Sequence, residues 1–231
     1  MKIIVLHIII TIIITFFTNE LNAQVIYPDA GSWNTFNVDY KLNKKLSAVF
    51  TEELRFKENF TRLNLFYTNL GLEYKLSNML KVAIIYRFVE KYRDDNSFSF
   101  RHRIMFDLTL KKKFDKIGFS YRQRVQAEKR DIYSSDIGYL PEWYSRNKFT
   151  LKYDTDKRYT PYASVELQYQ FRNPREWESD NTLHRSRYSI GVDYKINKKS
   201  TFGLYYLIQR EFNVVNPQYL YIVGMEYSIA L

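Results

Sequence analysis

The sequence has 231 residues, with 35 Lys and Arg against 25 Asp and Glu, a formal net charge of +10, and no cysteine. The lack of cysteine excludes a disulfide scaffold and a thiolate metal site. The charge alone does not choose between nucleic acid and other anionic partners. Aromatic residues make up 18% of the chain, chiefly 21 Tyr and 17 Phe, which favour β-strands and membrane–water interfaces.

Residues 1–23 have the pattern of a secretory signal peptide. Lys2 supplies a positive start, residues 3–17 form an apolar run, and Leu21-Asn22-Ala23 ends on a small residue. We therefore predict cleavage between Ala23 and Gln24 and export of residues 24–231. An uncleaved membrane anchor is the alternative, but the run is short for a bilayer span of about 20 residues.

The rest of the chain alternates between apolar and polar residues from about Ser32 to the last residue. In residues 80–89, for example, Leu80, Val82 and Ile84 share one face and Lys81, Ala83 and Ile85 share the other. Such a period of two predicts strands with one apolar and one polar face. The clearest further examples are residues 103–110, 117–122, 163–171, 187–196 and 219–231.

Short polar turns separate pairs of these strands, and longer hydrophilic loops lie between the pairs. The short turns are predicted at Asn43 to Lys45, Ser77-Asn78, Phe114 to Lys116, Asp154 to Lys157 and Asn197 to Lys199. Alternating short and long connections are typical of transmembrane barrels, whose strands have about ten residues. We therefore predict an all-β fold, a transmembrane antiparallel up-and-down β-barrel formed by residues 24–231.

Eleven strands can be recognised, but single-chain barrels generally have an even number. Twelve strands are expected, with Gln24 to Pro28 as a short extra strand, and ten is the alternative.

The composition of the two faces predicts which one faces lipid. One face is almost uninterrupted Leu, Ile, Val and Phe, whereas the other carries Gly, Ser, Asn, Gln, Arg and Glu. Tyrosines fall near the short-turn ends of the strands, as in the aromatic girdle at a membrane interface. They are Tyr40, Tyr74, Tyr153, Tyr194 and Tyr227. The apolar face is therefore expected outside, facing outer-membrane lipid.

Arginines on the polar face are the most specific candidate for a functional site. By parity they face the lumen, near the long-loop ends of the strands, and would form a basic belt that could bind anions. They are Arg55, Arg87, Arg101, Arg103, Arg122, Arg124, Arg146, Arg172, Arg185 and Arg187. The carboxylates Glu53, Glu128 and Glu166 share this region, and Asp107 and Asp193 lie nearer the short turns. Two interpretations stay open: ion pairs that fill the lumen, or unpaired guanidinium groups that attract phosphate or carboxylate.

Catalytic interpretations have little support in the sequence. After the signal segment only His102 and His184 remain, both with the parity of the apolar face at the outer rim, near Ser99 and Ser186. No nucleophile motif accompanies them, so no catalytic residue is assigned, and a metal site and a cofactor are not expected. Nucleic-acid binding is not expected either, because the basic residues are spread around the strands.

A set of short motifs resembles a known family. They are Thr51 to Phe56, Leu70 to Leu76, Tyr86-Arg87-Phe88, Phe100 to Arg103 and Gly31-Ser32-Trp33. Together they resemble the outer-membrane barrels of Bacteroidetes grouped as domain of unknown function 2490. The resemblance implies a membrane barrel without an established activity, substrate or cofactor.

The leading functional expectation is an outer-membrane barrel that is a passive or anion-preferring pore, or a structural envelope component. Its expected partners are outer-membrane lipid and, during biogenesis, the barrel-assembly machinery. One alternative is a lipid-modifying enzyme, an acyl hydrolase or transferase at the outer rim. Another is a surface-binding module that uses the loops Glu128 to Glu142 and Asn173 to Asn181.

Overall fold

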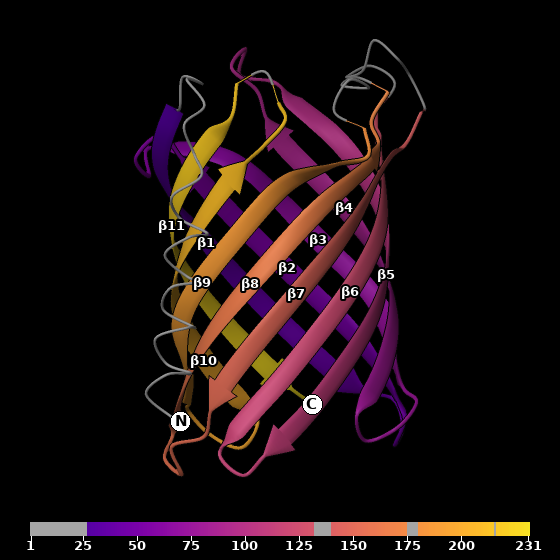
Figure 1. Cartoon of the computed structure of the whole chain (residues 1–231), viewed down its shortest axis with the longest axis vertical. Helices are drawn as coiled ribbons and strands as arrows, with labels where there is room; N and C mark the ends of the chain where they lie inside the picture. The colour runs from indigo at the N-terminus through magenta and orange to yellow at the C-terminus, as the bar shows by residue number, and fades with distance from the viewer. Residues whose placement is uncertain (1–26, 132–139, 175–179, 215) are drawn as a thin grey trace, which may run out of the picture.

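A computed structural model describes residues 27–131, 140–174, 180–214 and 216–231. The predicted signal segment and its cleavage site therefore lie outside the described residues. The described chain forms one closed β-barrel of strongly tilted strands (Figure 1). Its described part contains no helix long and apolar enough to cross a membrane.

Eleven strands make up the described barrel wall. In chain order they are β1 (Tyr27–Lys41), β2 (Leu46–Lys57), β3 (Arg62–Lys75), β4 (Leu80–Tyr92), β5 (Phe98–Phe114), β6 (Ile117–Arg130), β7 (Glu142–Tyr153), β8 (Tyr159–Arg172), β9 (Thr182–Lys195), β10 (Ser200–Glu211) and β11 (Gln218–Ala230). Each strand pairs antiparallel with its neighbours in sequence. The prediction of an all-β, up-and-down barrel is confirmed to this extent.

The predicted count of twelve strands is wrong, because β1 closes the barrel directly against β11. These two strands pair in parallel, from Tyr27 opposite Gln218 to Asp39 opposite Ala230. With an odd number of alternating strands, the first and the last must run in the same direction, so parallel pairing is the geometry that joins them. Tyr27 and Pro28 belong to β1 itself, so they do not begin a separate strand.

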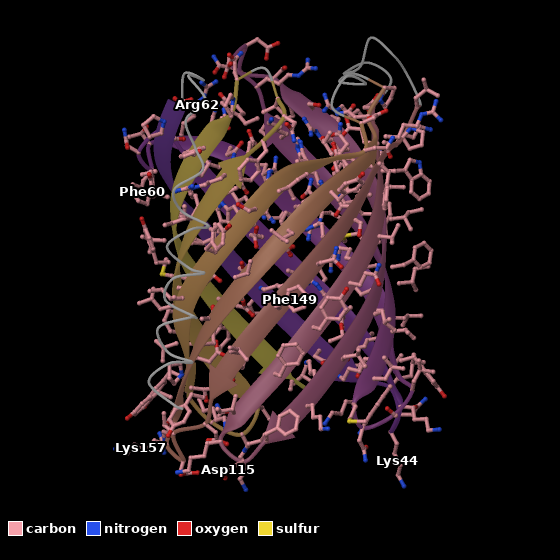
Figure 2. The ribbon with its side chains drawn as sticks, viewed as in Figure 1. Lys44, Phe60, Arg62, Asp115, Phe149 and Lys157 are labelled. Carbon is pink, nitrogen blue, oxygen red and sulfur yellow. The ribbon has the colours of Figure 1, made fainter. Side chains whose placement is uncertain are left out.

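In three of the short turns, a side-chain oxygen accepts hydrogen bonds from backbone N–H groups of the same turn. Asn43 accepts hydrogen bonds from the backbone N–H groups of Lys45 and Leu46 through its side-chain oxygen. Asn197 and Ser77 do the same for the two corresponding N–H groups of their own turns. Asx and Ser side chains favour turns for this reason. Lys44, Asp115 and Lys157 mark the short-turn end of the barrel, and Arg62 marks the long-loop end (Figure 2).

The outer surface of the wall is apolar. Exposed fractions reach 65% for Ile190, 57% for Leu70 and 55% for Phe106, and Phe149 lies exposed at mid-height of the wall (Figure 2). At the short-turn end, Tyr40, Tyr74, Tyr153 and Tyr194 are exposed, as the predicted girdle requires, whereas Tyr227 is half-buried and stacks on Phe36. Exposed apolar surface of this extent marks a site of contact with a membrane or with other protein.

The buried core of the protein lies inside the barrel, toward the long-loop ends of the strands. We call the buried apolar side chains there the lumen plug: Trp33, Tyr67, Val89, Met105, Tyr144, Leu207 and Ile222. They come from seven different strands and pack among buried polar side chains such as Gln126, Gln168, Gln170 and Gln209. The lumen is therefore filled by side chains toward the long-loop ends of the strands.

Candidate functional site

Strand alternation places nearly all of the predicted arginines inside the barrel. Residues two apart on a strand share a face, so the lumen receives Arg101 and Arg103 from β5, Arg122 and Arg124 from β6, and Arg185 and Arg187 from β9. The structure brings them close to carboxylates of neighbouring strands. The ion-pair interpretation of the belt therefore describes most of its members.

The largest ion-pair cluster is centred on Glu166 of β8. Its Oε1 accepts hydrogen bonds from Arg146 at 2.6 Å and from Arg187 at 2.9 Å, and its Oε2 accepts one from Arg122 at 2.9 Å. The carboxylate group is almost completely buried. One negative charge thus holds three guanidinium groups from β6, β7 and β9.

A second cluster, centred on Glu128, lies nearer the long loops. Glu128 Oε1 lies 3.1 Å from Arg101, and its Oε2 accepts a bond at 2.7 Å from Arg103 Nε. Arg130 of the same strand pairs with Glu142 at 2.9 Å. Both carboxylates are at most 3% exposed, so this level of the lumen is also packed.

Three further arginines, Arg55, Arg124 and Arg185, each pair with a single carboxylate. Glu53 binds Arg55 at 2.5 Å and accepts a hydrogen bond from Thr35 at 2.8 Å. The guanidinium group of Arg55 also lies 3.7 Å from the centre of the Trp33 ring. Arg185 pairs with Glu211 at 2.6 Å.

Arg87 is buried without an ion pair to any described carboxylate. Its Nε donates to the Asn69 side chain at 2.6 Å, and its guanidinium group lies 3.5 Å from the centre of the Tyr67 ring. A cation over an aromatic face is stabilised by the ring quadrupole. Arg103 lies directly opposite Arg87 across β4 and β5, so this part of the lumen keeps excess positive charge.

Arg172 does not join the belt, contrary to the prediction. The β7–β8 register shifts between Trp143 and Tyr144, which places Arg172 opposite Trp143 at the end of β8. Both side chains are exposed. A β-bulge reverses the alternation beyond it, and this bulge has no clear sequence signal.

Below the lumen plug lies a cavity of about 480 Å³, lined by residues of all eleven described strands. Arg87, Arg146 and Arg187 belong to its lining at the plug, and Glu73 and Lys81 belong to it beside the short turn between β3 and β4. The last two pair with each other, and their side chains are 24% and 31% exposed. The cavity therefore approaches solvent at the short-turn end and is closed at the long-loop end.

Sequence reasoning missed several contributors to this site, among them Lys148, Glu142 and Glu211. Lys148 lines the cavity on the same face of β7 as Arg146, a position that alternation alone could have revealed. Glu142 pairs with Arg130, an arginine outside the predicted belt, and Glu211 pairs with Arg185 of the belt. Their roles depend on strand register, for which the sequence carries no direct signal. Asp107 has the predicted inward parity, and it pairs with Arg124 at 2.6 Å.

The two histidines occupy different environments. His102 is exposed on the outer wall, and its Nδ1 lies 2.6 Å from the Tyr86 hydroxyl. His184 was expected on the outer rim but is buried, 5.6 Å from the Tyr144 ring, because the β8–β9 register shifts beside it. Among the described residues, neither ring bonds to a serine hydroxyl or a carboxylate.

The two long loops proposed as binding surfaces are only partly described. Residues 132–139 and 175–179, which form their central parts, lie outside the described residues.

Residues 30–219 match the family described as Protein of unknown function (DUF2490). The chain belongs to this family. No curated protein matches the sequence. Among solved structures, the DUF2490 chain is similar to one titled "NanC porin structure in rhombohedral crystal form", with a TM-score of 0.48 and 11% sequence identity. The similarity covers 78% of this chain and 86% of that chain.

Proposed function

We propose that this DUF2490 protein is an outer-membrane β-barrel whose lumen is closed toward the long-loop side, and that it is an envelope component rather than an open diffusion pore. The observation that carries the proposal is the lumen plug. Side chains at this level are almost fully buried, down to 0% exposure for Met105 and Gln170. To cross this level of the lumen, a solute larger than water would have to displace the packed apolar side chains and the ion-paired side chains beside them.

The membrane location is supported by the apolar outer wall and by the predicted signal peptide. Leu, Ile and Phe side chains cover the outside at mid-height, where bilayer hydrocarbon would contact them, and tyrosines ring the short-turn end. Short turns face the periplasm in barrels of this kind, so the cavity would open toward the periplasm. Fractionation of cells that express an epitope-tagged chain tests this part. Recovery in the soluble periplasmic or cytoplasmic fraction would contradict it.

Planar-bilayer conductance tests whether the lumen is closed. The wild-type protein is expected to show no steady conductance. The double variant Trp33→Ala/Tyr67→Ala removes two plug side chains that also line the cavity, and it should produce steady conductance.

The matched control is Trp143→Ala/Tyr86→Ala, which removes the same residue types from the outer wall, where they are 41% and 42% exposed. This variant should stay silent. Circular dichroism must show native strand content for each variant. Steady wild-type conductance would overturn the closed barrel, and anion selectivity of that conductance would favour the anion-preferring pore instead.

No catalytic role is proposed for His102 and His184. Among described residues they lack the hydrogen-bonded chain of acid, base and nucleophile that acyl transfer requires. Lipid mass spectra of cells with His102→Ala and His184→Ala are expected to match the wild type. An altered lipid profile would favour the lipid-modifying enzyme.

A further inference from the structure

The wall of the cavity carries more positive than negative charge. Its Lys and Arg residues are Arg55, Lys81, Arg87, Lys111, Arg122, Arg124, Arg146, Lys148 and Arg187, and its carboxylates are Glu53, Glu73, Asp107, Glu166 and Glu226. Nine cations thus face five anions. A buried charge is costly unless it is paired, so such a surplus inside a barrel favours an anionic ligand.

The surplus is concentrated around Lys148 of β7. This residue lies opposite Arg122 on one side and opposite Glu166 on the other. Glu166 already accepts hydrogen bonds from three arginines, and Lys148 forms no ion pair or hydrogen bond with any described residue. The ammonium group of Lys148 therefore faces the cavity with its hydrogen-bonding capacity unused.

Arg122 beside it also retains free donors. One terminal nitrogen binds Glu166, but its buried Nε has no hydrogen-bond partner among the described residues. Two threonines line the cavity close by: Thr109 of β5 lies opposite Arg122, and Thr150 lies two residues from Lys148 on the same face of β7. A compact anion placed here would meet two cationic donors and neighbouring hydroxyl groups.

The carboxylate on the other side of the cavity does not neutralise this cluster. Glu226 of β11 is held by Asn37 at 2.8 Å and by Ser228 at 3.1 Å, and it forms no ion pair with a described residue. Around Lys148 the wall therefore carries four cations, Arg122, Arg146, Lys148 and Arg187, and one carboxylate in direct contact with them, Glu166. This local excess favours binding of the anionic end of a ligand beside β6 and β7.

We propose that the cavity binds a small polyvalent oxyanion, a phosphate group or a short dicarboxylate, held by Lys148 and Arg122 and entering from the short-turn end. The cavity volume of about 480 Å³ falls within the range of small-molecule pockets. Charge-assisted hydrogen bonds from Lys and Arg are the usual means of holding such groups. The proposal concerns the barrel interior and does not depend on whether the plug blocks conductance.

Isothermal titration of the folded barrel in detergent with inorganic phosphate, and separately with succinate, tests this site. Both titrations use sodium chloride at matched ionic strength as the reference. We expect saturable binding of at least one of them with one site per chain. Binding of phosphate alone assigns phosphoryl ligands, and binding of succinate alone assigns carboxylates. Absence of both overturns the proposal.

Substitution of Lys148 connects the binding to this cluster. Lys148→Met should weaken binding about tenfold or more, and Lys148→Arg should restore most of it because the positive charge returns. Lys44→Met, in the exposed turn between β1 and β2, is the matched control and should bind like the wild type. Equal binding by Lys148→Met and the wild type would overturn the assignment. Circular dichroism confirms that each variant is folded, and Arg122→Gln gives a second, independent loss-of-binding variant.

Discussion

Asp107 of β5 accepts two hydrogen bonds from Arg124 of β6, one on each carboxylate oxygen and each at 2.6 Å. Both side chains are less than 10% exposed. Two parallel bonds of this kind fix the relative position of the groups that make them. The pair therefore links β5 to β6 inside the barrel. The Asp107 carboxylate also compensates the positive charge of Arg124, which lies directly opposite Arg146.

Replacing Asp107 by Asn should destabilise the barrel by about 3 kcal/mol, because it leaves a buried arginine without its counter-charge. The measurement is the free energy of unfolding in guanidinium chloride, with the protein in lipid vesicles. Asp115→Asn is the control, since Asp115 lies in an exposed turn at φ 49°, a conformation that Asn also tolerates. Equal stability of the two variants would show that the pair contributes little.

Gly224 of β11 should not tolerate a side chain. It lies opposite Tyr205 of β10, and a Cβ atom at this position would lie 1.9 Å from the Tyr205 ring. We expect Gly224→Val to cost about 1–3 kcal/mol, since overpacking forces side chains or backbone to move. At Gly118 of β6 the nearest atom to an added Cβ would be 3.8 Å away. Gly118→Ala should therefore leave the thermal unfolding midpoint unchanged or slightly raised.

The outer wall gives a test of lipid contact. Leu70→Arg places a charge on the exposed apolar face at the middle of β3, where it should cost about 2–4 kcal/mol in a bilayer. The same change at Leu42, which is exposed in the turn between β1 and β2, should cost about 1 kcal/mol or less. Folding titrations in phospholipid vesicles provide both values. A Leu70→Arg variant as stable as the wild type would argue against a lipid-facing wall.

The turn residue Asp154 should titrate at unusually low pH. The hydrogen bond that Lys113 donates to it, at 2.6 Å, lowers the pKa of the Asp154 carboxyl below its usual value of 3.8. A depressed folded-state pKa means that this interaction contributes above the unfolded-state pKa and is lost as the pH falls through the folded value. Carbon-detected NMR titration should show the low pKa in the wild type and a return toward 3.8 in Lys113→Gln. An unchanged pKa in that variant would exclude Lys113 as the cause.

Much of the barrel could be predicted from the sequence because alternation is a local property. The strand from residue 80 onward, the five short turns and the inward parity of arginines such as Arg146 all follow from patterns within a few residues. The parallel β1–β11 pairing could not be predicted in this way, since it joins residues about 190 positions apart. The outward position of Arg172 and the burial of His184 depend on bulges, which shift the parity without leaving a clear signal in the sequence.

The candidate site was predictable in its composition but not in its pairing. Alternation places Arg122, Arg146 and Arg187 inside, yet it does not show that all three converge on Glu166. That convergence depends on the register between four strands and on barrel tilt. Lys148 is left without an ion pair for the same reason, because the Glu166 carboxylate that lies opposite it is already bound by the three arginines.

The parallel pairing between β1 and β11 also constrains the order in which the protein can fold. Every other strand pair joins strands that are consecutive in sequence, so it can form without the rest of the barrel. The β1–β11 pair requires the first and the last strand to come together. Bringing together such distant segments carries the largest loop-closure entropy in the molecule. Until then both β1 and β11 have a free hydrogen-bonding edge, which is open to pairing with other chains. Closure should therefore be the last and slowest step of folding, and the step at which an assembly factor that shields strand edges has the greatest effect.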